Sequence, residues 1–233
     1  MPPLTPHQPP ARAVIFDMDG VLVDGEPLHF AAARDVLAGF GAELTWETYT
    51  DWIGETFDTI WPDIQRRFAL PVDRGEYERA FGPRVQEQYE RHAVAMPGAH
   101  DLLGRLRAAG VPLGLATSTK RPRVDIALAR LDLARFLTVT VSGDEVSRGK
   151  PDPEIYLTAA ARLDVPPERC LVLEDSPAGV ASARAAGMRA IGVRINGGSG
   201  RPLDGADRII ESLADFDLGW VETPQREGAQ AHA

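Results

Sequence analysis

The stretch "FDMDGVLVD", Phe16 to Asp24, sets three carboxylates directly after the apolar run Ala13–Phe16. A short apolar run with β-branched residues is typical of a strand that is buried on both faces. Asp17 and Asp19 then stand at the end of this strand, where two like charges repel each other unless water or a cation separates them. The stretch therefore predicts a buried strand that ends at a metal site.

Four later segments share this apolar texture, namely residues 111–119, 136–144, 169–175 and 188–194. Segments with apolar residues at helical spacing separate most of them, namely residues 100–110, 123–136, 153–165 and 176–187. Gly110 and Gly187 close the first and the last of these helices, where glycine is common. The alternation predicts an α/β fold, with a Rossmann-like, doubly wound parallel sheet.

Residues 26–95 interrupt this alternation, because their apolar residues recur at helical spacing with no convincing strand between them. We therefore expect an α/β core domain over residues 11–25 and 96–221, with an all-helical cap domain, residues 26–95, inserted after the first strand. In an open α/β sheet such a cap lies above the C-terminal edge of the strands, where ligands bind. Residues 1–10 and 222–233 have the composition of flexible tails.

Three of the four tryptophans, Trp46, Trp52 and Trp61, lie in this cap near Tyr49. Such side chains could form a stacking platform for a ligand. Aromatic residues at helical spacing more often form the interior of a helical domain, however, and we favour that interpretation.

The composition bounds the class of protein. The chain has 233 residues, a formal net charge of −9 and a pI near 5.1, which argues against nucleic acid or an anionic membrane as a partner. Its one cysteine, Cys170, excludes an internal disulfide and fits a reducing compartment, and the N-terminus has no apolar targeting segment. We expect a cytoplasmic protein that is a monomer or, alternatively, a homodimer.

A second pair of carboxylates strengthens the prediction of a metal site. Glu174 and Asp175, in "LEDSPAG", follow another apolar run and precede a helix. Because parallel strands end at the same edge of a sheet, these two residues can face one crevice with Asp17 and Asp19. Carboxylate oxygens suit hard cations such as Mg²⁺, which usually keep several waters and also take phosphate oxygens as ligands.

Two further polar residues at strand ends suit a phosphate group. Thr117, in "LATST", can donate its hydroxyl to a phosphoryl oxygen, and Lys150, in "RGKPDP", can place a compact positive charge beside it. Each residue alone is a weak signal, since threonine often caps a turn and lysine is usually solvated. Their common placement at strand ends predicts a phosphate clamp.

Four motifs together carry a resemblance to a known family. The segments "FDMDGVLVD", "LATST", "GKPDPEIY" and "LEDSPAGV" resemble the signature motifs of the haloacid dehalogenase superfamily of phosphohydrolases, in order and at familiar separations. The resemblance covers nearly the whole chain and includes a helical cap inserted after the first motif. The chain is most similar to the branch that contains β-phosphoglucomutase and the phosphatases of small sugar phosphates and phosphoglycolate.

The resemblance implies a role for each carboxylate of the first motif. Asp17 would attack phosphorus and form an aspartyl-phosphate, with Mg²⁺ as cofactor. Asp19 would protonate the leaving group and then activate water. An acid/base residue at this position favours phosphoryl transfer over carbon–halogen cleavage.

The resemblance also assigns the metal and phosphate ligands. The implied metal site consists of Asp17, Asp19 through its backbone carbonyl, Asp175, and Glu174 directly or through water. The phosphoryl group of a small phosphomonoester would be held by Thr117, Ser118 and Lys150.

The cap residues expected to contact substrate are His29, Gly54, Glu55, Thr56 and Phe57. In the mutase, an arginine of the cap grips the distal phosphate of a bisphosphorylated intermediate, and Phe57 stands at that position here. The resemblance therefore favours a phosphatase of small phosphomonoesters such as sugar phosphates. A phosphomutase that uses Arg66, Arg67 or Arg84 instead, and a non-catalytic module that binds phosphate ligands, remain alternatives.

Overall fold

Strand β1 (Ala13–Phe16) lies inside a six-stranded sheet with the order β3-β2-β1-β4-β5-β6, and all neighbouring strands are parallel. The other strands are β2 (Leu113–Ala116), β3 (Val139–Val141), β4 (Cys170–Glu174), β5 (Arg189–Val193) and β6 (Arg208–Ile210). The computed structural model describes residues 9–55, 57–195 and 200–222. It confirms the doubly wound α/β fold.

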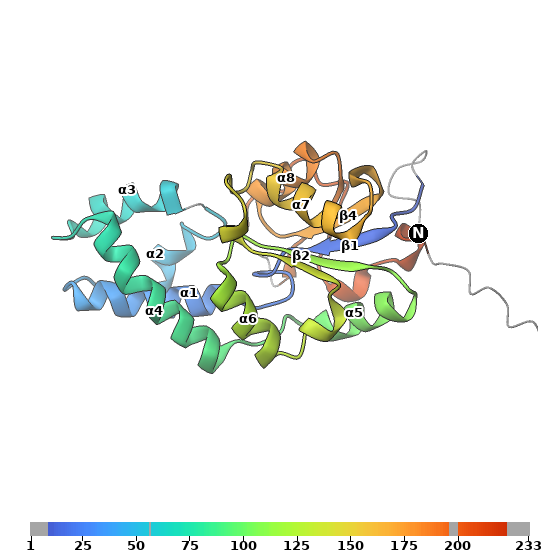
Figure 1. Cartoon of the computed structure of the whole chain (residues 1–233). Helices are drawn as coiled ribbons and strands as arrows, with labels where there is room; N and C mark the ends of the chain where they lie inside the picture. Colours follow the sequence, from blue (N-terminus) through green and yellow to red (C-terminus); the bar gives the residue numbers. More distant parts are fainter. Residues whose placement is uncertain (1–8, 56, 196–199, 223–233) are drawn as a thin grey trace, which may run out of the picture.

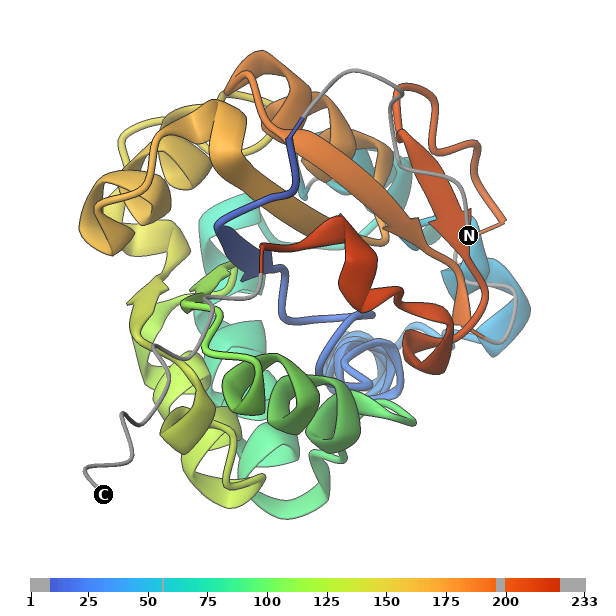
Figure 2. The same cartoon turned by 90° about the vertical axis from the view of Figure 1, so that its right-hand side faces the viewer.

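Helices cover both faces of the sheet (Figure 2). Helices α5 (Ala99–Ala108) and α6 (Arg121–Arg130) pack on one face, and α7 (Glu154–Leu163) and α8 (Pro177–Ala185) pack on the other. Because side chains alternate along a strand, Val14 and Phe16 of β1 join the first layer, whereas Ala13 and Ile15 join the second. This two-sided burial explains the continuous apolar character of the strands.

The helical prediction for residues 123–136 was wrong in one respect. Helix α6 ends at Arg130, Asp132 adopts a left-handed backbone with φ of 52°, and a separate 3₁₀ turn covers Ala134–Phe136. Strand β6 was not predicted, because the three residues of a short edge strand are too few for an apolar pattern to be recognised in the sequence. The other 3₁₀ helices in the described ranges are Gly143–Glu145, Pro167–Arg169, Leu213–Asp215 and Leu218–Trp220.

A helical lobe follows β1 and lies beyond one end of the sheet (Figure 1). It consists of α1 (Glu26–Gly39), α2 (Trp46–Thr50), α3 (Phe57–Phe68) and α4 (Arg74–His92). We propose that this lobe is the cap, with the boundaries 26–95 given above. The two connecting segments run side by side, since Asp24 N–H donates to Val94 O at 3.0 Å and Met96 N–H donates to Leu22 O at 2.9 Å.

Aromatic side chains form much of the interior of the cap. Tyr49 and Trp52 are buried and pack with Leu37, Ile64 and other apolar residues of the four helices. Trp46 is 45% exposed and lies against the neighbouring aromatic rings. This packing favours the interior role over a stacking platform.

The predicted tails, residues 1–10 and 222–233, lie mostly outside the described residues. Glu222, at the start of the second one, pairs with Arg169 at 2.6 Å, and its N–H donates to Ala11 O. In the described part of the chain, no helix combines the length and the apolar character needed to cross a membrane.

The junction between β4 and α8 leaves no space for a side chain at Gly179. A Cβ atom built there would lie 1.7 Å from Glu174 Oε1 and 1.8 Å from Glu174 Cδ. Glu174 is 1% exposed, so its carboxylate cannot move out of the way. The helix therefore requires glycine at this position in order to pack over the end of β4.

We expect Gly179→Ala to lower the free energy of unfolding by about 1–3 kcal/mol, because the added methyl group overpacks a buried site. Gly104→Ala in α5 is the matched control, since no atom outside its own helix backbone lies within 4 Å of the added Cβ. Alanine there should raise the free energy of unfolding by about 0.5–1 kcal/mol through its higher helix propensity. Denaturant titrations followed by circular dichroism measure both values, and a stabilised Gly179→Ala would contradict the steric argument.

Candidate active site

A cavity of about 670 Å³ lies between the C-terminal ends of the strands and the cap. Its core side is lined by Asp17, Asp19, Thr117, Ser118, Lys150, Glu174 and Asp175, and its cap side by His29, Gly54, Glu55 and Phe57, among others. The structure thus brings together all the predicted site residues that it describes. The remaining one, Thr56, lies outside the described residues.

Lys150 lies between the carboxylates of Asp17 and Glu174. Its Nζ lies 2.5 Å from Asp17 Oδ1 and 2.6 Å from Glu174 Oε1, and it also donates to the backbone carbonyl of Ala116 at 3.1 Å. Burial opposes the charge of the ammonium group, but the two carboxylates outweigh it and raise the pKa of Lys150 well above its usual value. Lys150 is therefore a permanent cation at this site.

Glu174 is fully engaged in hydrogen bonds. Its Oε1 accepts from Lys150 and from the Tyr156 hydroxyl at 2.9 Å, and its Oε2 accepts from Ser176 N–H at 3.0 Å and Ser176 Oγ at 2.9 Å. Burial acts to raise the pKa of Glu174, but the charge of Lys150 and these hydrogen bonds lower it below its usual value. In this arrangement the main effect of Glu174 is to fix Lys150 beside Asp17.

In contrast to Glu174, Asp17 and Asp175 have surroundings that raise the pKa of their carboxyl groups. Burial, followed by the charges of Glu174 and Asp19, raises the pKa of Asp17 to about 8 despite Lys150. Burial and the charges of Glu174 and Asp17 likewise raise the pKa of Asp175 well above its usual value. For both carboxylates, the nearby positive charge does not offset burial and the neighbouring carboxylates.

A divalent cation fits this shortage of positive charge. The Asp175 carboxylate accepts no hydrogen bond from the described residues, and it lies against Gly20, where a Cβ atom would be 1.9 Å from Asp175 Oδ2. Within residues 9–55, 57–195 and 200–222, no group of three or more Asp, Glu, His or Cys side chains could by itself hold a metal ion. A site of two carboxylates that is completed by a backbone carbonyl, water and phosphate is the kind that Mg²⁺ commonly uses.

Asp19 lies in the same cavity but has different neighbours. Its Oδ2 accepts from Thr119 Oγ1 at 2.8 Å, and its Oδ1 accepts from the Tyr89 hydroxyl of the cap. Tyr89 in turn contacts His29 Nε2 at 3.1 Å. Asp17 is thus bound by a cation of the core, whereas Asp19 is bound by neutral hydroxyl groups.

The loop after β2 carries the predicted phosphate ligands. Thr117 is 1% exposed, and its Oγ1 accepts from Thr119 N–H at 3.1 Å. The loop is anchored to the end of β3, because Thr117 N–H donates to Val141 O and Gly143 N–H donates to Thr119 O, both at 3.0 Å. Ser118, by contrast, is exposed at the cavity wall.

The sequence analysis missed several neighbours of the site, among them Arg74, Thr119 and Tyr89. Arg74 is a cap cation that lines the cavity, 5.0 Å above the Phe57 ring, and it pairs with Asp58 and Glu78. Thr119 stands two residues after Thr117 in the bend that follows β2, and its N–H donates to Thr117 Oγ1, so a second hydroxyl close to the predicted phosphate ligand was the available signal.

The arginines suggested as alternatives lie elsewhere on the cap. Arg66 pairs with Asp63, Arg67 pairs with Asp51 and Asp63, and Arg84 pairs with Glu87; none of the three lines the cavity. The cap arginine that lines the cavity is instead Arg74, which the spacing of the motifs did not indicate.

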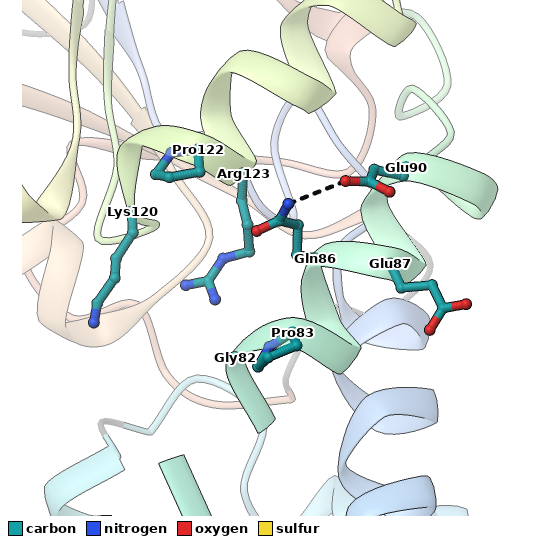
Figure 3. A pocket seen from close by; sticks show the side chains of 8 residues that line it. All are labelled: Gly82, Pro83, Gln86, Glu87, Glu90, Lys120, Pro122 and Arg123. Carbon is teal, nitrogen blue, oxygen red and sulfur yellow. Dashed lines mark hydrogen bonds between the residues drawn. The ribbon is translucent and has the colours of Figure 1, made fainter. Parts of the chain in front are cut away.

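A second cavity of about 410 Å³ lies between α4 and the start of α6 (Figure 3). Gln86 and Glu90 line it from the cap, joined by a hydrogen bond of 3.0 Å, and Lys120 and Arg123 line it from the core. None of the predicted catalytic residues reaches it. The strand-end carboxylates therefore belong to the larger cavity.

Comparison with known proteins identifies the family. The model of the haloacid dehalogenase-like hydrolases matches residues 11–187. A phosphorylated carbohydrates phosphatase of Thermotoga maritima is 39% identical over 189 residues, which cover 77% of this chain and 83% of that protein. The β-phosphoglucomutase of Bacillus subtilis is 30% identical over 223 residues, which cover 89% and 92%.

Solved structures agree with this assignment. The crystal structure of the protein CbbY from Rhodobacter sphaeroides, in complex with xylulose-(1,5)bisphosphate, has a TM-score of 0.79 and 28% sequence identity, and the match covers 91% of this chain and 100% of that one. The matched family model spans most of the chain, including all four motifs. The chain therefore belongs to the haloacid dehalogenase-like hydrolase family.

Proposed function

We propose that this hydrolase is a Mg²⁺-dependent phosphatase that cleaves small phosphomonoesters, with sugar phosphates as the preferred class, through an aspartyl-phosphate at Asp17. One observation carries the proposal: Asp17 and Asp19 line one cavity but are held by different partners, Lys150 for the first and two hydroxyl groups for the second. Two carboxylates in different environments suit the separate roles of nucleophile and acid/base. The name of the Thermotoga relative supports the substrate class.

In the first step an Asp17 oxygen attacks phosphorus, and the bond between phosphorus and the ester oxygen breaks. Asp19 donates its proton to the departing oxygen. In the second step Asp19 takes a proton from water, which attacks phosphorus and releases phosphate and free Asp17. Thr117, Ser118 and Lys150 bind and orient the phosphoryl oxygens during both steps.

The proposed cofactor is Mg²⁺, and when it is bound it neutralises charge on the phosphoryl oxygens. Its ligands would be Asp17, the backbone carbonyl of Asp19 and Asp175. Glu174 would contribute through water, because its oxygens already accept hydrogen bonds from Lys150 and three other donors.

Composition supports our proposals for the cellular location and the partners of the protein. We propose a cytoplasmic protein, monomeric or homodimeric, whose partner is a small molecule and not nucleic acid or a membrane. The acidic net charge of −9 supports this proposal, since both of those surfaces are anionic.

The alternative of a phosphomutase rests on Arg74. It is the cap arginine that lines the cavity, and a distal phosphate needs such a partner. Its guanidinium group is already paired with Asp58 and Glu78, however, so a second phosphate would have to displace carboxylates. We therefore favour the phosphatase.

Asp17→Asn should reduce phosphate release at least about a thousandfold, because the amide cannot form the phosphoenzyme. The assay uses Mg²⁺ with a panel of phosphomonoesters, and EDTA should abolish the wild-type activity. Asp35→Asn, on the exposed face of α1, is the control and should retain full activity.

Calorimetry supplies a readout independent of turnover, since Asp175→Asn should weaken Mg²⁺ binding. Full activity of Asp17→Asn would contradict the nucleophile, and phosphate binding without any turnover would point to a binding module.

Arg74→Met separates the phosphatase from the phosphomutase. For a phosphatase we expect kcat to stay within about threefold, because the lost cation does not touch the transferring phosphoryl group. For a mutase, formation of glucose 6-phosphate from β-glucose 1-phosphate with a bisphosphate primer should fall by about a hundredfold, since a charge-assisted hydrogen bond is worth roughly 1.5–3 kcal/mol and the site loses a bidentate one. Arg66→Met is the matched control, and product analysis by coupled assay decides between the two outcomes.

A further inference from the structure

A buried tyrosine of the cap contacts the proposed acid/base residue. Tyr89, in the last third of α4, has no exposed surface, and its hydroxyl donates to Asp19 Oδ1. The ring packs in the main apolar cluster with residues of β1 and the connecting segments. The residue thus joins a helix of the cap to a carboxylate at the end of β1.

The direction of the hydrogen bonds follows from the atoms. The Tyr89 hydroxyl has a single proton, and it donates this proton to Asp19 Oδ1. The phenolic oxygen can then accept from His29 Nε2, which lies 3.1 Å away. On the other side, Thr119 Oγ1 donates to Asp19 Oδ2 at 2.8 Å. Each oxygen of Asp19 therefore has its own donor.

Backbone packing restricts Asp19 further. A Cβ atom built on Gly25 would lie 2.1 Å from Asp19 Oδ1, so the carboxylate rests against the backbone of the connecting segment. Gly25 on one side and the hydroxyl groups of Tyr89 and Thr119 at the two oxygens restrict the orientation of this side chain. Removing the Tyr89 donor would leave Asp19 Oδ1 without this partner and would let the carboxylate rotate.

We propose that Tyr89 is a positioning residue that sets the orientation of Asp19 for proton transfer. The inference rests on the proposed function, because it gives Asp19 the acid/base role. A positioned acid/base group contributes roughly a hundredfold to ten-thousandfold to the rate, and a carboxylate that is misaligned for part of the time loses part of that factor. Tyr89 does not contact the reacting atoms and acts only through Asp19.

Tyr89→Phe tests the hydrogen bond and preserves the ring packing. We expect kcat for a sugar phosphate to fall by about tenfold to a hundredfold, with KM within about threefold, because the phosphate ligands are unchanged. Tyr77→Phe is the matched control: Tyr77 lies on the same helix with 2% exposure, and its ring packs against Phe57 and Phe81 instead. That variant should keep the wild-type kcat.

A double-mutant cycle distinguishes positioning from a general effect on structure. Single-turnover rates at excess enzyme are measured for wild type, Tyr89→Phe, Asp19→Asn and the double variant. If Tyr89 acts through Asp19, it has no further effect once Asp19→Asn is present, so the double variant should match Asp19→Asn. A further tenfold loss in the double variant, or an unchanged kcat in Tyr89→Phe alone, would overturn the inference. An unchanged rate in Asp19→Asn would instead overturn the proposed acid/base role.

Discussion

The ammonium group of Lys150 holds two buried carboxylates together, and the rest of the site depends on it. Asp17 and Glu174 end adjacent strands, since Phe16 of β1 is paired with Leu173 of β4, so the sheet itself brings the two negative charges close. Without a cation between them they would repel, and leaving one such charge unpaired in the interior is strongly destabilising. The hydrogen bonds from Tyr156 and Ser176 to Glu174, and the close approach of Gly179, all serve to fix this pair.

The turn after β1 gives the two aspartates different partners. Asp17 points to the core cation, and after the left-handed Gly20 the chain folds back, with Leu22 N–H and Val23 N–H both donating to Met18 O at 2.8 Å. Asp19, two residues from Asp17, instead reaches the cap hydroxyl of Tyr89. Two carboxylates that are close in the chain therefore have different hydrogen-bond partners, as their separate chemical roles require.

Most of the site at the strand ends could be predicted from the sequence. In the cap, the described residues that the resemblance marked do line the cavity, but Arg74 and Tyr89 could not be predicted. Parallel strands end at one edge, so apolar runs followed by Asp17, Thr117 and Asp175 were enough to place these residues together. Arg74 and Tyr89 stand on a helix whose pattern reports only its own buried face. Which of its residues meet the sheet edge depends on how the cap docks, and a pattern along one helix does not contain that information.

The charge around the cavity connects the metal to the choice of substrate. Glu55 and Asp58 add to the carboxylates of the strand ends, and Glu26 adds part of a charge because burial raises its pKa to about 7. Lys150 and Arg74 are the lining cations among the described residues. A phosphate dianion entering this surplus of negative charge is repelled unless a divalent cation is present, so the proposed Mg²⁺ serves binding as well as reaction. A second phosphate would add two more negative charges where the remaining cation, Arg74, is already paired. The same charge balance that supports the proposed metal thus works against bisphosphates and favours substrates whose distal end is neutral, as the hydroxyl groups of a sugar are.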